Sequence, residues 1–133
     1  TILLDFDGTC VAHEYPFVGE DIGAQQVLHD LVSNGHKLIL FTMRSEINYL
    51  DDAVAWFKEQ DIPLYGVQSH PEQKSWTASP KAYGELIIDD TMLGAKLVDG
   101  RYLNWQWTAE ALCAQGLITP AQLAAYDFSL YVF

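Results

Sequence analysis

The sequence predicts an α/β fold in which a Rossmann-like parallel sheet carries helices on both faces. Short apolar runs alternate along the chain with segments of helical periodicity, which is typical of parallel strands joined by crossover helices. Three of the apolar runs end abruptly in polar residues, as buried strands do when they present functional groups at their carboxyl ends. We therefore expect these polar strand ends to face one crevice.

Length and composition predict one domain. The chain has 133 residues, of which 50% are hydrophobic and 19% charged. This is enough apolar material for a core and too little polar bias for disorder. We expect a single domain over residues 1–133, in which residues 97–133 form a C-terminal extension that packs on the core or on a partner subunit.

The first half of the chain contains two predicted strands. Residues 1–4 are apolar and lead into the motif Asp5-Phe6-Asp7-Gly8-Thr9. A helix is predicted within residues 22–34, where apolar residues recur at helical spacing before Gly35, which is placed for a left-handed cap. The next strand is expected at residues 37–41 and again ends at polar residues.

The second half repeats this pattern. Residues 50–57 predict an amphipathic helix, and residues 62–67 a third strand. Residues 68–80 are polar and turn-prone, so they predict a loop or a short irregular helix. The apolar run at residues 86–88 then ends at Asp89-Asp90.

The C-terminal extension is less regular. A helix is expected at residues 108–115, and Thr119-Pro120 is suited to the N-cap and first turn of a last short helix. The final residues alternate imperfectly and predict either an added edge strand or a contact surface for another subunit. They are Phe128, Leu130, Tyr131, Val132 and Phe133.

Charge and cysteine usage limit the partners and the compartment. The net charge is −11 with only seven scattered basic residues, which opposes binding to a nucleic-acid backbone. A small anionic substrate is still allowed, because a bound divalent cation inverts the local field. Cys10 and Cys113 form no paired motif, so a reducing, cytoplasmic location is expected. We also expect no membrane span and no leader, since no apolar run approaches roughly 20 residues.

Two aspartates after the first strand have the chemistry for phosphoryl transfer. Asp5, at the strand end, is the candidate nucleophile for attack on phosphorus. Asp7 is placed to protonate the leaving oxygen and later to take a proton from water.

A Mg²⁺ site is expected at the same place, because hard cations prefer oxygen ligands. The predicted ligands are Asp5, the backbone carbonyl of Asp7, and a carboxylate of the Asp89-Asp90 pair. Asp89 is expected to bind the metal directly and Asp90 to orient a metal-bound water, although an exchange of these two roles stays open.

Further groups are expected on the phosphoryl oxygens of a substrate. Thr42 and Lys81 can supply a hydroxyl and a positive charge, and Lys74 competes with Lys81 for the cationic role. Gly8 belongs to the same substrate-binding set. Arg44 suits either a bidentate clamp on an anionic substrate or a surface ion pair.

Other residues near these motifs receive structural interpretations. Cys10 is expected to pack, since no histidine is spaced to activate it. His13, in a flap formed by residues 10–20, is expected within reach of a substrate. Three tryptophans are interpreted as buried anchors of the loop and the extension: Trp76, Trp105 and Trp107.

Taken in chain order, four motifs resemble those of the haloacid dehalogenase superfamily: Asp5-Phe6-Asp7-Gly8-Thr9, Thr42 after an apolar strand, Lys81, and Ile87-Ile88-Asp89-Asp90. The resemblance runs from about residue 2 to about residue 96. It implies a Mg²⁺-dependent phosphatase that works through an aspartyl-phosphate intermediate, with catalytic residues Asp5, Asp7, Thr42 and Lys81.

The spacing of these motifs leaves no room for a cap domain, so the chain resembles the capless subgroup of that superfamily. Capless members tend to use large substrates that close the site, or a lid from a neighbouring subunit. We therefore expect a phosphorylated small molecule or a larger phosphoester as substrate, and a homo-oligomer as one candidate assembly. The alternative is a catalytically silent binding or assembly module that keeps the fold and the metal site.

Overall fold

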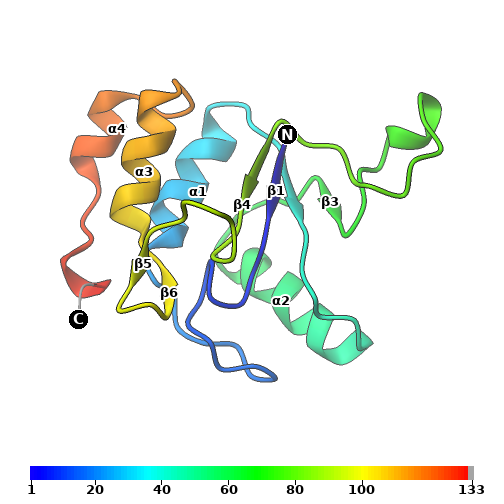
Figure 1. Cartoon of the computed structure of the whole chain (residues 1–133), viewed down its shortest axis with the longest axis horizontal. Coiled ribbons are helices and arrows are strands. Elements are labelled where there is room, and N and C mark those ends of the chain that lie inside the picture. Colours follow the sequence, from blue (N-terminus) through cyan, green and yellow to red (C-terminus); the bar gives the residue numbers. More distant parts are fainter. Residues whose placement is uncertain (132–133) are drawn as a thin grey trace.

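A computed structural model of the chain describes residues 1–131 and shows a four-stranded parallel sheet (Figure 1). The strands are β1 (Ile2–Leu4), β2 (Leu38–Leu40), β3 (Gly66–Val67) and β4 (Leu86–Ile88), in the spatial order β3-β2-β1-β4. The predicted α/β fold with a Rossmann-like parallel sheet and no separate cap is confirmed.

The chain crosses from one side of β1 to the other, which makes the end of β1 a topological switch point. It runs from β1 outward to β2 and β3, and then returns to pair β4 with the free edge of β1. In open parallel sheets, ligands bind beyond the carboxyl ends of the strands at such a point. The register, with Leu4 opposite both Leu40 and Ile88, brings the carboxyl ends of these three strands level.

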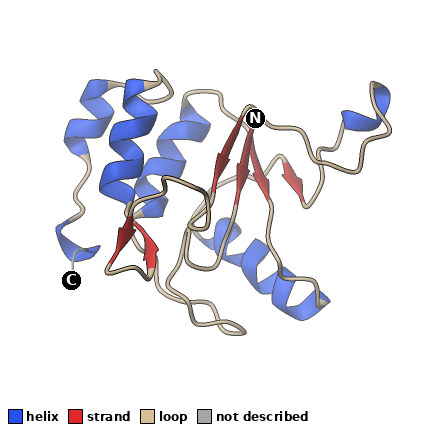
Figure 2. Cartoon of the chain, in the orientation of Figure 1, coloured by secondary structure: helices blue, strands red, loops and turns tan. Residues whose placement is uncertain are grey.

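Helices pack beside the sheet (Figure 2). They are α1 (Ala24–Ser33), α2 (Ile47–Glu59), α3 (Trp105–Ala114) and α4 (Pro120–Ala125). All four predicted helical segments are confirmed, with shifted bounds. Gly35 follows α1 at a φ of +92°, a left-handed conformation that favours glycine.

The two faces of the sheet are covered unequally. On one face, Ile2 and Leu4 share a buried cluster with residues of α1, α2 and α3. On the other face, Leu3 and Ile39 pack with Ala82 of the long β3–β4 connection and with Tyr65, which directly precedes β3.

Helices were predicted on both faces, but within the described residues the β3–β4 connection contains only one short 3₁₀-helix, η1 (Gln73–Ser75). The polar, turn-prone composition of residues 68–80 explains why no longer helix forms there.

The C-terminal extension begins with a β-hairpin that the sequence analysis did not predict. Strands β5 (Leu97–Val98) and β6 (Tyr102–Leu103) pair in antiparallel fashion. Asp99 and Gly100 between them have φ values of 52° and 68°, as a tight primed turn requires. The hairpin leads into α3, which packs beside α1 (Figure 1).

The described end of the chain is a 3₁₀-helix and not an edge strand, which was one of the two predicted alternatives; the other, a contact surface for a second subunit, stays a prediction. A capping box of Thr119 and Gln122 opens α4, as its Thr-Pro pair indicated. The described residues end in the 3₁₀-helix η2 (Ser129–Tyr131), where Phe128 and Tyr131 lie close to Gly23. Val132 and Phe133 lie outside the described residues. No helix in the described part of the chain is long and apolar enough to cross a membrane.

Candidate functional site

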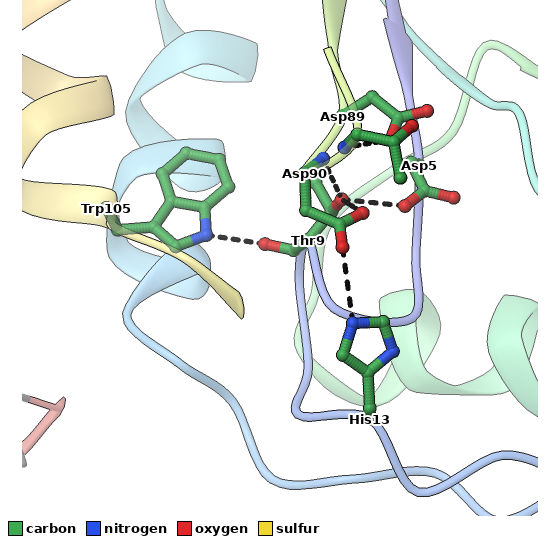
Figure 3. Close-up of polar contacts among 7 residues, drawn as sticks. Asp5, Thr9, His13, Asp89, Asp90 and Trp105 are labelled. Carbon is green, nitrogen blue, oxygen red and sulfur yellow. Dashed lines mark hydrogen bonds and ion pairs between the residues drawn. The ribbon is translucent and has the colours of Figure 1, made fainter. Parts of the chain in front are cut away.

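Three carboxylates meet at the switch point of the sheet (Figure 3). Asp5 directly follows β1, and Asp89 and Asp90 directly follow β4. The backbone N–H of Asp5 donates to the Ile88 carbonyl at 3.0 Å, which fixes the two strand ends together. One oxygen from each carboxylate lies within 4.8 Å of the others, close enough to bind one metal ion.

Thr9 organises this cluster, although the sequence analysis gave it no separate role. Its side chain is completely buried, and its hydroxyl lies 2.7 Å from Asp5 Oδ2 and 3.1 Å from Asp90 Oδ1. The same oxygen accepts the backbone N–H of Asp90 at 3.0 Å. A single hydroxyl thereby connects the nucleophile candidate on β1 to the acidic pair on β4.

The cluster holds Asp5 in an environment that opposes its charge. The pKa of Asp5 is raised from 3.8 to about 7, chiefly by burial and also by the nearby charge of Asp89, whereas the hydrogen bond from Thr9 opposes the rise. Desolvation and a like charge both disfavour the ionised carboxylate. A divalent cation would offset both effects, so this donor set fits a hard cation such as Mg²⁺.

Gly8 is required by the space beside it. It has a φ of +80°, and a Cβ at this position would lie 2.1 Å from His13 Nε2 and 2.7 Å from Asp90 Oδ2. Without that atom, His13 of the flap approaches Asp90 Oδ2 to 3.2 Å (Figure 3). The flap histidine therefore lies at the carboxylate cluster.

Asp7 lies outside the three-carboxylate group and faces Arg44 instead. Arg44 Nε donates to Asp7 Oδ2 at 2.8 Å, and Arg44 Nη2 donates to Asp7 Oδ1 at 2.7 Å. This is a bidentate ion pair, the strongest geometry available to a guanidinium and a carboxylate. The hydrogen bond to Asp7 is the main reason why the pKa of Arg44 is raised.

Arg44 has no donor left for a substrate. Beyond Asp7, its remaining N–H groups donate to the carbonyls of Pro16, Phe17 and Tyr49 at 3.3, 2.9 and 2.9 Å. A guanidinium has five N–H donors, and these contacts use all of them. The side chain is 2% exposed. Arg44 is thus neither the substrate clamp nor the surface ion pair that the sequence suggested, but a buried tie between the first motif, the flap and α2.

Thr42 lies at the same edge of the sheet as Asp5, because it follows β2 and the N–H of Phe41 donates to the Leu4 carbonyl at 2.8 Å. The Thr42 hydroxyl accepts the backbone N–H of Arg44 at 3.2 Å. Gln68, just after β3, holds the backbone of Thr42 through paired hydrogen bonds of 2.9 and 2.7 Å. Sequence reasoning missed this glutamine.

The structure does not bring Lys81 to the carboxylates. The segment that precedes β4 runs beside the N-terminus (Figure 1), and the N–H of Glu85 donates to the Thr1 carbonyl. Lys81 therefore lies towards the amino-terminal end of the sheet, where it lines a separate hollow with Trp76. Lys74, its competitor, lies in η1 of the same connection.

The C-terminal extension supports the first motif directly. The indole N–H of Trp105 donates to the Thr9 carbonyl at 2.6 Å (Figure 3), and the N–H of Leu103 donates to the Gly8 carbonyl at 2.9 Å. Trp105 is buried, as expected of an anchor, but Trp76 and Trp107 are exposed. Cys10 is fully buried, and burial raises the pKa of its thiol well above the usual value, which agrees with a packing role.

The fold and the site define a class of α/β proteins with a carboxylate cluster at the switch point of a parallel sheet. A solved structure of a conserved protein from Bacteroides thetaiotaomicron is 30% identical to this chain, with a TM-score of 0.69. The match covers 93% of this chain and 96% of that one. The chain belongs to the family of this Bacteroides protein. No family model matches the sequence, and no curated protein matches it either.

Proposed function

We propose that this protein is a Mg²⁺-dependent phosphatase of the haloacid dehalogenase type. The observation that supports this proposal most strongly is the group of three carboxylates at the switch point, in which Asp5 occupies the end of the central strand β1. The motif order in the sequence agrees with that placement. The substrate would be a phosphomonoester.

Asp5, Asp89 and Asp90 would hold the metal ion, which would supply positive charge to the phosphoryl oxygens. Their oxygens are close enough to share one cation, and the raised pKa of Asp5 supports this role, because a bound cation would favour its ionised form. Which of Asp89 and Asp90 is the direct ligand stays a prediction. The hydroxyl of Thr91 donates to Asp89 Oδ1 at 2.8 Å. The carboxylate of Asp90 instead contacts the Thr9 hydroxyl and the His13 ring.

The chemistry would proceed in two displacements on phosphorus. An oxygen of Asp5 forms a bond to phosphorus, the ester bond breaks, and the leaving alkoxide takes a proton from Asp7. Water then attacks the aspartyl phosphate, Asp7 accepts a proton, and inorganic phosphate leaves. Arg44 positions Asp7 for both transfers, because it occupies only one lone pair on each oxygen of that carboxylate.

The proposal is tested by hydrolysis of para-nitrophenyl phosphate with Mg²⁺, with EDTA, and by the variant Asp5→Asn. We expect EDTA to stop turnover and Asp5→Asn to lower kcat more than about a thousandfold, since an amide cannot form the acyl phosphate. Asp99→Asn is the matched control, because Asp99 lies in the exposed turn of the β5–β6 hairpin. Turnover by Asp5→Asn would refute the assigned nucleophile.

A second candidate is a catalytically silent binding module that keeps the metal site. It is favoured by the positions of the two basic residues expected at the site: Arg44 is fully hydrogen-bonded, and Lys81 lies towards the other end of the sheet. Such a protein would bind Mg²⁺ in a calorimetric titration but form no phosphoenzyme in acid-quenched reactions with labelled aryl phosphate or acetyl phosphate. Trapping of label on wild-type protein, but not on Asp5→Asn, would exclude this candidate.

A further inference from the structure

An apolar cavity of about 370 Å³ lies beside the carboxylate cluster. It is enclosed by the β4 strand, by the loop of residues 92–95, and by one side of α3. Its walls include Ile87, Met92, Leu103, Trp107 and Ala111. Ile87, Met92 and Trp107 are between 37% and 45% exposed, so these apolar surfaces remain accessible to a ligand.

The cavity and the carboxylate cluster share one residue. Asp89 lines the cavity and also belongs to the group that can hold a metal ion. A phosphoryl group bound at the carboxylates would therefore lie next to the cavity, and a substituent on its ester oxygen could enter it.

The cavity wall selects against a charged or highly polar substituent. No lysine, arginine or histidine is present among the described residues that line it, and its polar members are Asp89, Thr108 and Gln115. The hydroxyl of Thr108 already donates to the Asn104 carbonyl at 2.8 Å. A second phosphate inside the cavity would find no basic side chain among the described lining residues, which disfavours nucleoside polyphosphates.

We infer that this cavity binds the apolar alcohol part of the substrate, so that the protein takes phosphomonoesters of alkyl or aryl alcohols. The inference rests on the proposed phosphate site at Asp5, Asp89 and Asp90. At roughly 30 Å³ per non-hydrogen atom, the volume corresponds to about a dozen such atoms. Burial of the alcohol would add binding energy in proportion to its apolar area.

The test measures binding of n-alkylphosphonates, from ethyl to octyl, by titration calorimetry in the presence of Mg²⁺. Phosphonates are not hydrolysed, so this measurement does not depend on catalysis. We expect affinity to rise about threefold to fourfold with each added methylene until the cavity is full. Ala111→Phe fills the cavity from α3 and should flatten this dependence. Ala114→Phe is the matched control, because Ala114 is exposed on the same helix and does not line the cavity.

Absent phosphonate binding, affinity independent of chain length, or an equally steep dependence in Ala111→Phe would overturn the inference. A wild-type dimer that Ala111→Phe dissociates in sedimentation experiments would assign the cavity to a second copy of the chain and would also overturn it. Steep binding without turnover of any n-alkyl phosphate would refute the proposed phosphatase while the ligand class stands.

Discussion

Arg44 is a buried charge whose hydrogen-bond partners are the Asp7 carboxylate and three backbone carbonyls. It joins Asp7 to the flap carbonyls of Pro16 and Phe17. We expect Arg44→Met to destabilise the protein by about 3–5 kcal/mol, because it leaves Asp7 without its partner in a partly buried position. Arg44→Lys should recover little of this loss, since an ammonium cannot form the bidentate contact. Urea unfolding followed by tryptophan fluorescence measures both effects.

Arg101 provides the control for this prediction. It is exposed and pairs only with Asp99, at 3.5 Å, so Arg101→Lys should change the free energy of unfolding by less than about 0.5 kcal/mol. If Arg44→Lys unfolds with the same free energy as the wild type, then the positive charge is sufficient and the five N–H donors of the guanidinium are not needed.

Asp5 makes the stability of the metal-free protein depend on pH. Its pKa is raised from 3.8 to about 7 in the folded state, so between these values the folded chain binds a proton that the unfolded chain does not. The resulting stabilisation is present at low pH and is lost as pH rises through about 7. We expect the free energy of unfolding in EDTA to fall by about 1–2 kcal/mol between pH 5.5 and 8, after allowance for the solvent-exposed part of the carboxyl group.

The variant Asp5→Asn checks the assignment of this pH dependence. In this variant most of the fall in the free energy of unfolding between pH 5.5 and 8 should disappear. A smaller decrease with pH should remain, because burial also raises the pKa of Asp21. An unchanged slope in Asp5→Asn would mean that another group is responsible.

At the scale of elements, α3 supports the motif that follows β1. The contact from Trp105 to the Thr9 carbonyl spans 96 residues of sequence. We expect Trp105→Phe to cost about 1–3 kcal/mol, since it leaves a buried carbonyl without its donor. It should also weaken Mg²⁺ binding several-fold, because Thr9 holds Asp5 and Asp90. Unfolding and titration calorimetry test the two effects.

Trp107→Phe is the control on the same helix, as Trp107 is exposed and lines the apolar cavity, whereas Trp105 contacts the first motif. It should leave Mg²⁺ affinity unchanged. Equal Mg²⁺ affinity in Trp105→Phe and the wild type would show that the extension stabilises the domain without positioning the site.

The elements also show where local sequence patterns suffice. The helices α1 and α4 were predicted because periodicity, Gly35 and the Thr119-Pro120 pair are local signals. The β5–β6 hairpin was missed, although Asp99-Gly100 is a strong turn signal. Its strands are two residues long, too short for any alternation to be recognised.

For the whole molecule, Mg²⁺ should act as a stabilising ligand. The free energy of unfolding should rise by about 1.4 kcal/mol for each tenfold increase in Mg²⁺ above its Kd, because only the folded chain brings the three carboxylates together. Thermal unfolding over a Mg²⁺ series measures this. Asp89→Asn should largely remove the effect, whereas Asp99→Asn should keep it. A similar Mg²⁺ response in both variants would indicate general screening of the charge of −11.

The sequence by itself determined the parallel α/β fold and the presence of Asp5, Thr42 and Asp89 at strand ends, because strand and helix periodicity and turn residues are local signals. Only the tertiary structure decided which side chains meet. It brought Thr9 into hydrogen-bond contact with Asp5 and Asp90, paired Arg44 with Asp7, and placed Lys81 towards the other end of the sheet. Those outcomes depend on packing between distant segments, and a buried polar group takes whichever partner the fold brings within hydrogen-bond distance.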